Sequence, residues 1–339
     1  MKHVDHIVNE RTVLQYLTLL NIKANKDKEY SKNGGPPDNS DAFEACPFIV
    51  QFISSFQDME HLYFELEYVS GCSLLSQIRK ANPIIQQHYL FYAQEVLLTL
   101  QYLSRQGVIY RDLKPENICL SMSHKGHVKL VDFGFAKILS RLDARTETNC
   151  GTPAYIAPEI LKSIPYGFEV DVWSFGVLLV EIVSGQTPFY SEDTKGIYEK
   201  VTKCQPNYNG LIPPTLRDLL DKIFVLDQEN RIKYNQIKKH ALFHELDWSK
   251  SMSEIFHEMT APFLPKEEDF NEKPIRASTE KKKGFAAFLK DTDGGQQDQN
   301  MIFDEDHFNK FLKEDVENRE ESSPSNQKHN SKALGQSNQ

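Results

Sequence analysis

The alternation of apolar and polar residues divides the first part of the chain into a helix, a polar segment and two strands. Residues 3–20 carry apolar positions at mostly helical spacing, which predicts a helix. The next stretch, 21–41, is polar and contains adjacent glycines and prolines, so we predict a disordered loop there. Two β-rich runs follow at 47–56 and 61–69, and the second alternates in the manner of a strand.

The middle of the chain is predicted to be mostly helical. A long, strongly apolar helix is expected over about 85–106, and Gly107 stands where its C-cap would fall. Residues 108–135 alternate between short strands and turns, and helical patterns return over about 155–243. The pattern therefore favours an α+β fold whose larger part is helical.

The end of the chain differs from the rest in composition. Beyond about residue 243, charged and amide residues dominate and aromatic residues are sparse, which is typical of an extended tail. The last stretch, 313–339, is rich in Glu, Ser, Asn and Gln, and we predict that it is disordered.

Composition and charge narrow the classes of partner. Of the 339 residues, 40% are apolar and 26% are charged, so the chain can bury a sizeable core. The formal net charge of −9 argues against nucleic acid and anionic membranes as partners and leaves basic peptides as substrates. The five cysteines are scattered, and the first residues do not form a signal peptide. We therefore expect a protein of the cytoplasm, with access to the nucleus.

One short loop carries the residue types that phosphoryl transfer requires. The string YRDLKPEN spans residues 110–117. Within it, Asp112 can accept the proton of an attacking hydroxyl group, Lys114 can reach the transferring phosphate, and Asn117 can bind Mg²⁺. An aspartate in a turn is more often only a cap, so this string alone is a weak signal.

Two further strings complete the set. Asp132 begins a DFG, where it offers a carboxylate to the other metal ion, and APE ends at Glu159 after a segment of activation-loop length. The three strings in this order and spacing form the known signature of protein kinases.

By these residues the chain resembles the AGC group of serine/threonine protein kinases, most closely the cyclic-nucleotide-dependent kinases. The resemblance covers about residues 2–266 and also includes EYVSG, KLVDFGFAK, RTETNCGTPAYIAPE, DVWSFGVLLVEIVSGQTPF and APFLPK. It implies an α+β, protein-kinase-like fold with an incomplete small lobe. The expected parts are a partial small lobe over 1–68 with the disordered insertion 21–41, a large lobe over 69–243, a C-terminal tail over 244–312 and a disordered end over 313–339.

The resemblance implies ATP and Mg²⁺ as cofactors and assigns residues to them. Asp112 is the expected base, and Thr152 is expected to hydrogen-bond both this base and Lys114. The residues expected to contact the nucleotide are Glu10, Glu67, Val69, Cys119 and Asp132, and those expected to bind Mg²⁺ are Asn117 and Asp132.

The resemblance also implies a phosphorylation switch at Thr148. A phosphate brings nearly two negative charges, which need cationic partners to order a loop. The expected partners are Arg111, Lys137 and His6.

Three further residues are expected to hold the large lobe together. Glu159 is expected to form a buried ion pair with Arg231, and Asp171 to cap the catalytic loop through backbone N–H groups. Each of them has a structural role whether or not the chain is an active enzyme.

Acidic residues indicate the substrate class only in part. Glu116 and Glu181 match positions at which basophilic relatives bind arginines of a peptide substrate. Ser73 and Ala154 stand where relatives often have glutamate, so we predict a weakened or altered preference for Arg at the third position upstream. The expected partners are protein or peptide substrates and a regulatory subunit or an upstream activating kinase.

The sequence departs from the family pattern before its first helix. None of the 16 glycines forms a G-x-G, and no V-A-x-K lysine is present to pair with Glu10. Three interpretations stay open. The chain is an active kinase whose full-length form includes an upstream small lobe, a catalytically inactive pseudokinase or scaffold, or the product of an incomplete gene model.

Overall fold

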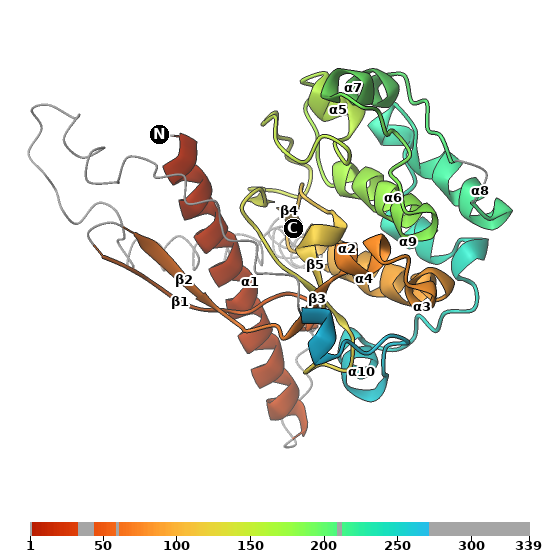
Figure 1. Cartoon of the computed structure of the whole chain (residues 1–339). Coiled ribbons are helices and arrows are strands. Elements are labelled where there is room, and N and C mark those ends of the chain that lie inside the picture. Colours follow the sequence, from red (N-terminus) through yellow and green to blue (C-terminus); the bar gives the residue numbers. More distant parts are fainter. Residues whose placement is uncertain (1, 33–43, 59–60, 209–211, 271–339) are drawn as a thin grey trace, which may run out of the picture. The chain divides into compact units, whose positions relative to one another are not determined.

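A long first helix, small sheets and a helical region follow one another in the computed structural model (Figure 1), which describes residues 2–32, 44–58, 61–208 and 212–270. The chain divides into two units, and all the helices and strands belong to the first, which comprises residues 1–58 and 62–280. Of the second unit, residues 59–61 and 281–339, only His61 is described. The predicted disordered end, 313–339, therefore lies outside the described residues.

The first helix, α1 (Lys2–Lys32), is longer than the sequence predicted. The predicted helix is confirmed, but the predicted loop is wrong over residues 21–32, which continue the helix. Asn21 explains part of this continuation of the helix. Its buried side chain donates to the carbonyl of Cys46 at 3.2 Å and accepts the N–H of Cys46 at 2.9 Å. No glycine or proline occurs before residue 34, so nothing in the sequence of 21–32 ends the helix. The rest of the predicted loop lies outside the described residues.

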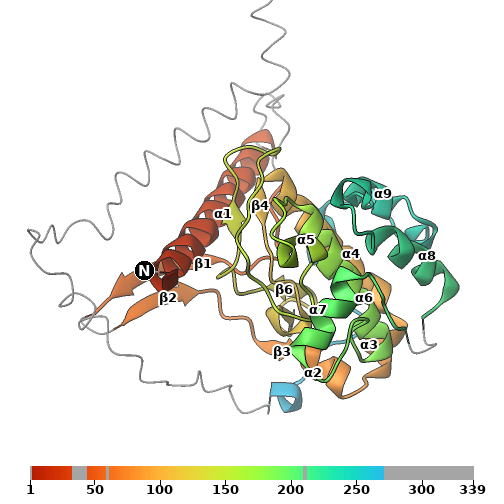
Figure 2. The same cartoon turned by 90° about the horizontal axis from the view of Figure 1, so that it is seen from above.

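The two predicted β-rich runs form an antiparallel pair beside α1 (Figure 2). These strands are β1 (Phe52–Gln57) and β2 (Leu62–Leu66), as predicted. Their inward rings, Phe52 and Phe64, meet edge to face with centroids 6.3 Å apart. The N–H of Phe52 donates to the hydroxyl of Thr18 at 3.0 Å, which joins the pair to α1.

Two small sheets frame the loop that contains Asp112. Strands β3 (Gly71–Ser73), β5 (Ile118–Ser121) and β6 (Val128–Leu130) form one antiparallel sheet. The other joins β4 (Val108–Ile109) to β7 (Lys137–Ile138). The loop therefore leaves one sheet at β4 and enters the other at β5, so both of its ends are fixed.

Buried helices support these sheets. The predicted helix over 85–106 appears as α3 (Pro83–Gln87) and α4 (Tyr89–Arg105), and α4 stops before Gly107, whose φ of 73° suits a helix end. Helix α6 (Glu169–Ser184) is buried on nearly all sides and ends at Gly185, with φ 75°. The other helices are α2 (Leu74–Arg79), α5 (Pro158–Leu161), α7 (Thr194–Thr202), α8 (Pro214–Ile223), α9 (Tyr234–Lys238) and α10 (Met252–Glu258).

Short 3₁₀ helices lie at Pro115–Asn117, Gln228–Asn230, Ala241–Phe243 and Glu267–Phe270. The combination of buried helices and small antiparallel sheets confirms the predicted α+β class. None of the helices in the described ranges is both long and apolar enough to cross a lipid bilayer.

Candidate active site

The carboxylate of Asp112 is held on both of its oxygens. It is buried, with 1% of the residue exposed, in the loop after β4. Lys114 Nζ donates to one carboxylate oxygen and the hydroxyl of Thr152 donates to the other, each at 2.7 Å. Lys114 also donates to the Thr152 hydroxyl at 3.0 Å, which closes a triangle of three side chains. The carboxylate is therefore fixed in one orientation.

Asn117 faces the same carboxylate from the 3₁₀ helix at the end of the loop. Its side-chain nitrogen donates to the backbone carbonyl and to the carboxylate of Asp112, both at 3.0 Å. Because the amide nitrogen is engaged in this way, a metal ion would be bound by the amide oxygen. The structure thus brings together the base and the three residues that the sequence placed around it.

The backbone of the loop is held from below by Asp171 near the start of α6. The carboxylate of Asp171 accepts the N–H of Tyr110 at 2.9 Å and the N–H of Arg111 at 2.8 Å. Burial raises the pKa of Asp171 to about 6, while these two N–H donors lower it. The expected contact is present, and it supports Arg111 in a left-handed backbone conformation, with φ 67°.

Asp132 and Glu10 form a second acidic group next to this loop. Asp132 has φ 59°, and its carboxylate accepts the N–H of Gly134 at 3.1 Å. A Cβ atom on Gly134 would lie 3.2 Å from Asp132 Oδ1 and 3.7 Å from Glu10 Oε2, so the helix α1 reaches the DFG turn. Burial, and then the charge of Asp132, raise the pKa of Glu10 to about 7, against the N–H of Phe133, which lowers it.

This donor set fits Mg²⁺ held together with a nucleotide. Carboxylate and amide oxygens, from Asp132 and Asn117, are the ligands that Mg²⁺ prefers. The parts of the chain that the structure describes contain no cluster of three His, Cys, Asp or Glu placed to hold a metal.

The residues expected near adenine lie in two places, after β2 and in β5. The side chain of Glu67 is bonded to Lys129 Nζ at 2.9 Å, and its N–H donates to the carbonyl of Gln51 at 2.9 Å, so of these groups only its carbonyl is left for a nucleotide. Val69 lies between β2 and β3, and Cys119 is a half-buried residue of β5. Burial raises the pKa of Cys119 to about 11.

Thr148 lies on the surface, with a buried arginine and a half-buried lysine near it. Arg111 donates through Nε to the carbonyl of Phe135 at 2.6 Å and is only 7% exposed. Lys137 Nζ donates to the hydroxyl of Thr146 at 3.0 Å, and this hydroxyl lies 3.3 Å from that of Thr148. Of the three expected partners, two are thus near Thr148, and the side chain of His6 lies outside the described set.

The structure brings the two expected substrate-binding acids close together. Glu116 is exposed, and Glu181 is half-buried with one carboxylate oxygen that has no hydrogen-bond partner in the described part of the chain. Burial, and then the charge of Glu116, raise the pKa of Glu181 to about 8, while Arg79 lowers it. Such a pair of acids favours a cationic ligand.

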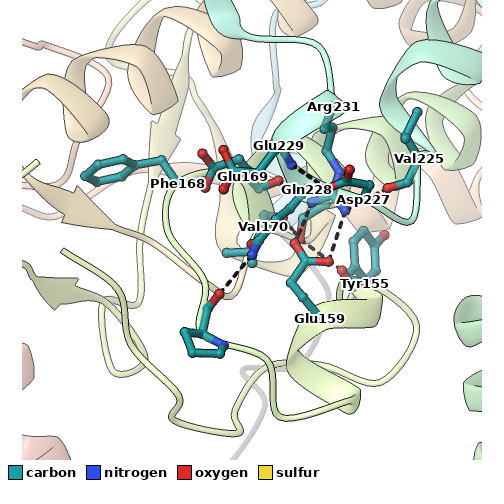
Figure 3. Close-up of polar contacts among 12 residues, drawn as sticks. Tyr155, Glu159, Phe168, Glu169, Val170, Val225, Asp227, Gln228, Glu229 and Arg231 are labelled. Atoms are coloured by element: carbon teal, nitrogen blue, oxygen red, sulfur yellow. Dashed lines mark hydrogen bonds and ion pairs between the residues drawn. The ribbon is translucent and has the colours of Figure 1, made fainter. Parts of the chain in front are cut away.

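The expected ion pair between Glu159 and Arg231 is present and buried (Figure 3). The guanidinium donates to the two carboxylate oxygens at 2.6 Å and 3.0 Å. It also donates to the carbonyls of Glu169 at 2.8 Å and Val225 at 3.0 Å. The pair therefore ties α5 to the start of α6 and to the segment after α8.

Sequence reasoning missed two residues of this region. Lys129 is buried in β6 and holds Glu67, and Tyr166 lies behind Thr148 with its side chain buried. Lys129 begins the string KLVDFGFAK but was given no role, Tyr166 belongs to none of the recognised strings, and both meet partners that are distant in the sequence. A lysine in an otherwise apolar strand, at Lys129, is the one signal that could have been noticed.

The comparison with known families agrees with the fold and the site. The protein kinase domain family matches residues 40–243, which is more than half of the chain. The chain therefore belongs to the protein kinase domain family.

Known relatives narrow the class. The chain is 40% identical over 212 residues to cAMP-dependent protein kinase type 3 of Saccharomyces cerevisiae, which covers 61% of the chain and 52% of the relative. It is 39% identical over 222 residues to a RAC family serine/threonine-protein kinase homolog of Dictyostelium discoideum, covering 65% and 49%. It is 38% identical over 221 residues to protein kinase C delta type of Mus musculus, covering 65% and 32%.

These similarities confirm the resemblance to AGC kinases of the cAMP-dependent kind. The chain spans about half the length of the first two relatives and a third of the third.

Proposed function

We propose that this protein is a serine/threonine protein kinase that transfers the γ-phosphate of ATP to Ser or Thr hydroxyl groups of protein substrates. The carrying observation is the fixed carboxylate of Asp112, bonded to Lys114 and Thr152 and adjoined by Asn117. A general base must be held in one orientation to meet the attacking hydroxyl, and this network provides that.

Each residue has a separate task in the proposed reaction. Asp112 accepts the proton of the attacking hydroxyl, and Thr152 keeps it oriented. Lys114 lies 2.7 Å from Asp112, so its charge is available both to the base and to a phosphoryl group beside it. Bound ATP supplies the phosphoryl group, and Mg²⁺ neutralises its oxygens.

The nucleotide and metal are assigned to residues around this loop. Asn117 and Asp132 bind Mg²⁺ through oxygen atoms. Backbone groups of Glu67 and Val69 border the adenine, together with Cys119. Glu10 contacts the DFG turn, so we place it beside the phosphates of the nucleotide.

We assign basic peptides to the acidic pair Glu116 and Glu181. Glu181 has a carboxylate oxygen without a hydrogen-bond partner among the described residues, and this oxygen and the nearby charge of Glu116 favour a cation there. An arginine or lysine upstream of the target residue has the required charge. Ser73 and Ala154 supply no carboxylate for a second arginine, which supports a weakened preference at the third position upstream.

Regulation is assigned to Thr148, with an upstream activating kinase or a regulatory subunit as partner and the cytoplasm as the location. Arg111 and Lys137 lie near this exposed threonine, and a phosphate there has cationic partners.

The test is phosphate transfer by the full-length protein that carries these 339 residues. We expect transfer from MgATP, labelled at the γ-phosphate, to Ser/Thr peptides with upstream basic residues. Asp112→Asn should lower kcat by about 10²- to 10⁴-fold. Asp221→Asn, an exposed aspartate of α8, is the matched control and should leave kcat unchanged. Absence of transfer by the wild-type protein would overturn the proposal.

A second candidate is a pseudokinase that binds peptides or partners without transferring phosphate. It is favoured by Glu10, whose raised pKa is set by burial and by the like charge of Asp132, with no cation among its causes in the described part of the chain. Binding of the basic peptides without any transfer of phosphate, measured by calorimetry and by the labelled-phosphate assay, would support this alternative.

A further inference from the structure

Tyr166 joins the segment that carries Thr148 to the loop that carries Asp112. It belongs to the segment that links α5 to α6 in the sequence. Its ring is buried, with 1% of the residue exposed. Its hydroxyl accepts a hydrogen bond from Arg111 Nη1 at 3.1 Å and donates one to the backbone carbonyl of Thr148 at 2.5 Å. One oxygen atom therefore connects the two segments directly.

The backbone of Tyr166 holds the same segment a second time. Its N–H and carbonyl exchange hydrogen bonds with Thr146, both at 2.9 Å, as an isolated antiparallel bridge. Thr146 is buried and Thr148 is exposed, so the chain emerges from the protein between them. Tyr166 thus fixes the place where Thr148 reaches the surface.

On its other side, Tyr166 fixes the guanidinium of Arg111. That group is planar and has two directional contacts, from Nε to the carbonyl of Phe135 at 2.6 Å and from Nη1 to Tyr166. Arg111 directly precedes Asp112, and its own N–H is bonded to Asp171. A change in the guanidinium position therefore acts on a backbone that is rigidly connected to the base.

We propose that Tyr166 is a positioning residue that couples phosphorylation of Thr148 to the orientation of Arg111, and through it to Asp112. This proposal rests on the proposed kinase function. A phosphate on Thr148 attracts the Arg111 guanidinium, and the Tyr166 hydroxyl sets the distance between them by holding the Thr148 carbonyl and Arg111 at once. Burial raises the pKa of Tyr166 to about 12, so at neutral pH the hydroxyl keeps the proton that it donates.

The test compares Tyr166→Phe with the wild-type full-length protein, each prepared with threonine or with genetically encoded phosphothreonine at position 148. The measured quantities are kcat and the KM for peptide. Phosphorylation should raise kcat in the wild type, and this increase should be about tenfold smaller in Tyr166→Phe, with the KM for peptide unchanged. An equal increase in the two proteins would overturn the proposal.

Tyr208→Phe is the matched control. Tyr208 is also buried, and its hydroxyl has no hydrogen-bond partner among the described residues. It should respond to phosphorylation as the wild type does. A comparable loss of the response in Tyr208→Phe would show a general effect of removing a buried hydroxyl and would contradict the proposal.

Hydrogen exchange separates this proposal from the proposed kinase activity. Phosphorylation should slow amide exchange over residues 144–150 in the wild type, and less so in Tyr166→Phe, whether or not phosphate is transferred. If neither protein transfers phosphate, the kinase proposal fails while the exchange result still decides the role of Tyr166. Equal slowing in the two proteins would count against Tyr166.

Discussion

At the scale of single residues, the carboxylates of the site differ in how firmly hydrogen bonds hold them. Asp112 has both oxygens bonded, to Lys114 and Thr152, and Asp171 holds the N–H of the residue before it. Glu181, in contrast, has an oxygen without a hydrogen-bond partner among the residues that the structure describes. The first carboxylate is fixed for proton transfer, and the second is suited to receive a ligand.

Removing the Thr152 hydroxyl tests the fixed carboxylate. Thr152→Ala deletes the donor to Asp112 and an acceptor for Lys114, so kcat should fall by about 10- to 100-fold with little change in the KM for ATP. Thr152→Ser keeps the hydroxyl and should retain most of the activity. Steady-state kinetics checks both variants, and a fully active Thr152→Ala would show that the orientation of Asp112 does not depend on this contact.

The titration of Glu181 tests the ligand-binding carboxylate. Its pKa of about 8 means that the neutral acid predominates below this pH and the carboxylate above it. The KM for a peptide with an upstream arginine should therefore decrease as the pH rises from about 6.5 to 9. In Glu181→Gln this decrease should be absent.

A peptide with citrulline in place of the arginine serves as the control, since it has the same shape and no charge. If the two peptides show the same pH dependence of KM, Glu181 does not recognise the cation.

At the scale of elements, α6 organises the helical region. Asp171 near its start holds the catalytic loop, and the carbonyl of Glu169 receives Arg231. The ring of Trp173 lies 5.1 Å from the same guanidinium. Helix α6 is therefore connected to both the loop of the base and the buried ion pair.

The buried ion pair should contribute far more to stability than surface pairs do. Arg231→Ala leaves the carboxylate of Glu159 buried without a cation, so the free energy of unfolding should decrease by about 3–5 kcal/mol. Lys266→Ala removes a pair with Glu268 in which both side chains are 76% exposed, and should cost at most about 1 kcal/mol. Urea denaturation measures the free energy of unfolding of both variants, and equal decreases would contradict the burial of the pair of Glu159 and Arg231.

Sequence patterns predicted elements better than they predicted contacts. The strands at 52–57 and 62–66 and the helix that stops before Gly107 were accessible, because each depends on neighbouring residues. The group around Asp112 includes Thr152, 40 positions away, and was accessible only through the resemblance to the kinase strings. The helical segment 21–32 was missed because the glycines and prolines that begin at residue 34 were extended backwards into it.

The contacts of Tyr166, Lys129 and His127 could not have been found in the same way. Tyr166 meets Arg111 across 55 positions, and Lys129 meets Glu67 across 62. Such pairs are formed by the tertiary fold, and no local spacing reports them. The chemical roles assigned to the site residues stay predictions.

At the scale of the whole molecule, a buried histidine connects the large helical region to the segment that follows α10. His127 Nδ1 contacts the carboxylate of Glu95 in α4 at 2.5 Å, and Nε2 contacts the carbonyl of Met259 at 3.0 Å. His127 and Glu95 are fully buried, and the ring of Phe256 lies 5.3 Å from that of His127. The imidazole is thus one of the contacts that attach the segment after α10, together with the Phe263 N–H, which donates to the Tyr92 hydroxyl at 3.1 Å.

This attachment should depend on pH. Burial lowers the pKa of His127, but the hydrogen bond and charge of Glu95 and the carbonyl of Met259 outweigh it, so the pKa is raised overall. A raised pKa contributes stability that is complete below the unfolded pKa of about 6.5 and is lost as the pH rises through the folded pKa. The free energy of unfolding should therefore fall as the pH is raised from 6 through the folded pKa.

His127→Gln should remove this pH dependence and lower stability at pH 6. Chemical denaturation at several pH values measures the free energy of unfolding of both proteins. Exposed His244 provides the control, because His244→Gln should leave the pH dependence as in the wild type. A wild-type stability that does not change over this range would contradict the role of the imidazole.

The buried pair of Glu159 and Arg231 also constrains how the sequence can evolve. Losing either partner leaves an unpaired charge in the core, whereas replacing both by apolar residues of similar volume costs little. The fitness effect of a change at one position is therefore set by the residue at the other. Across homologues the two positions should be inherited as a unit, and intermediates that carry only one change should be rare.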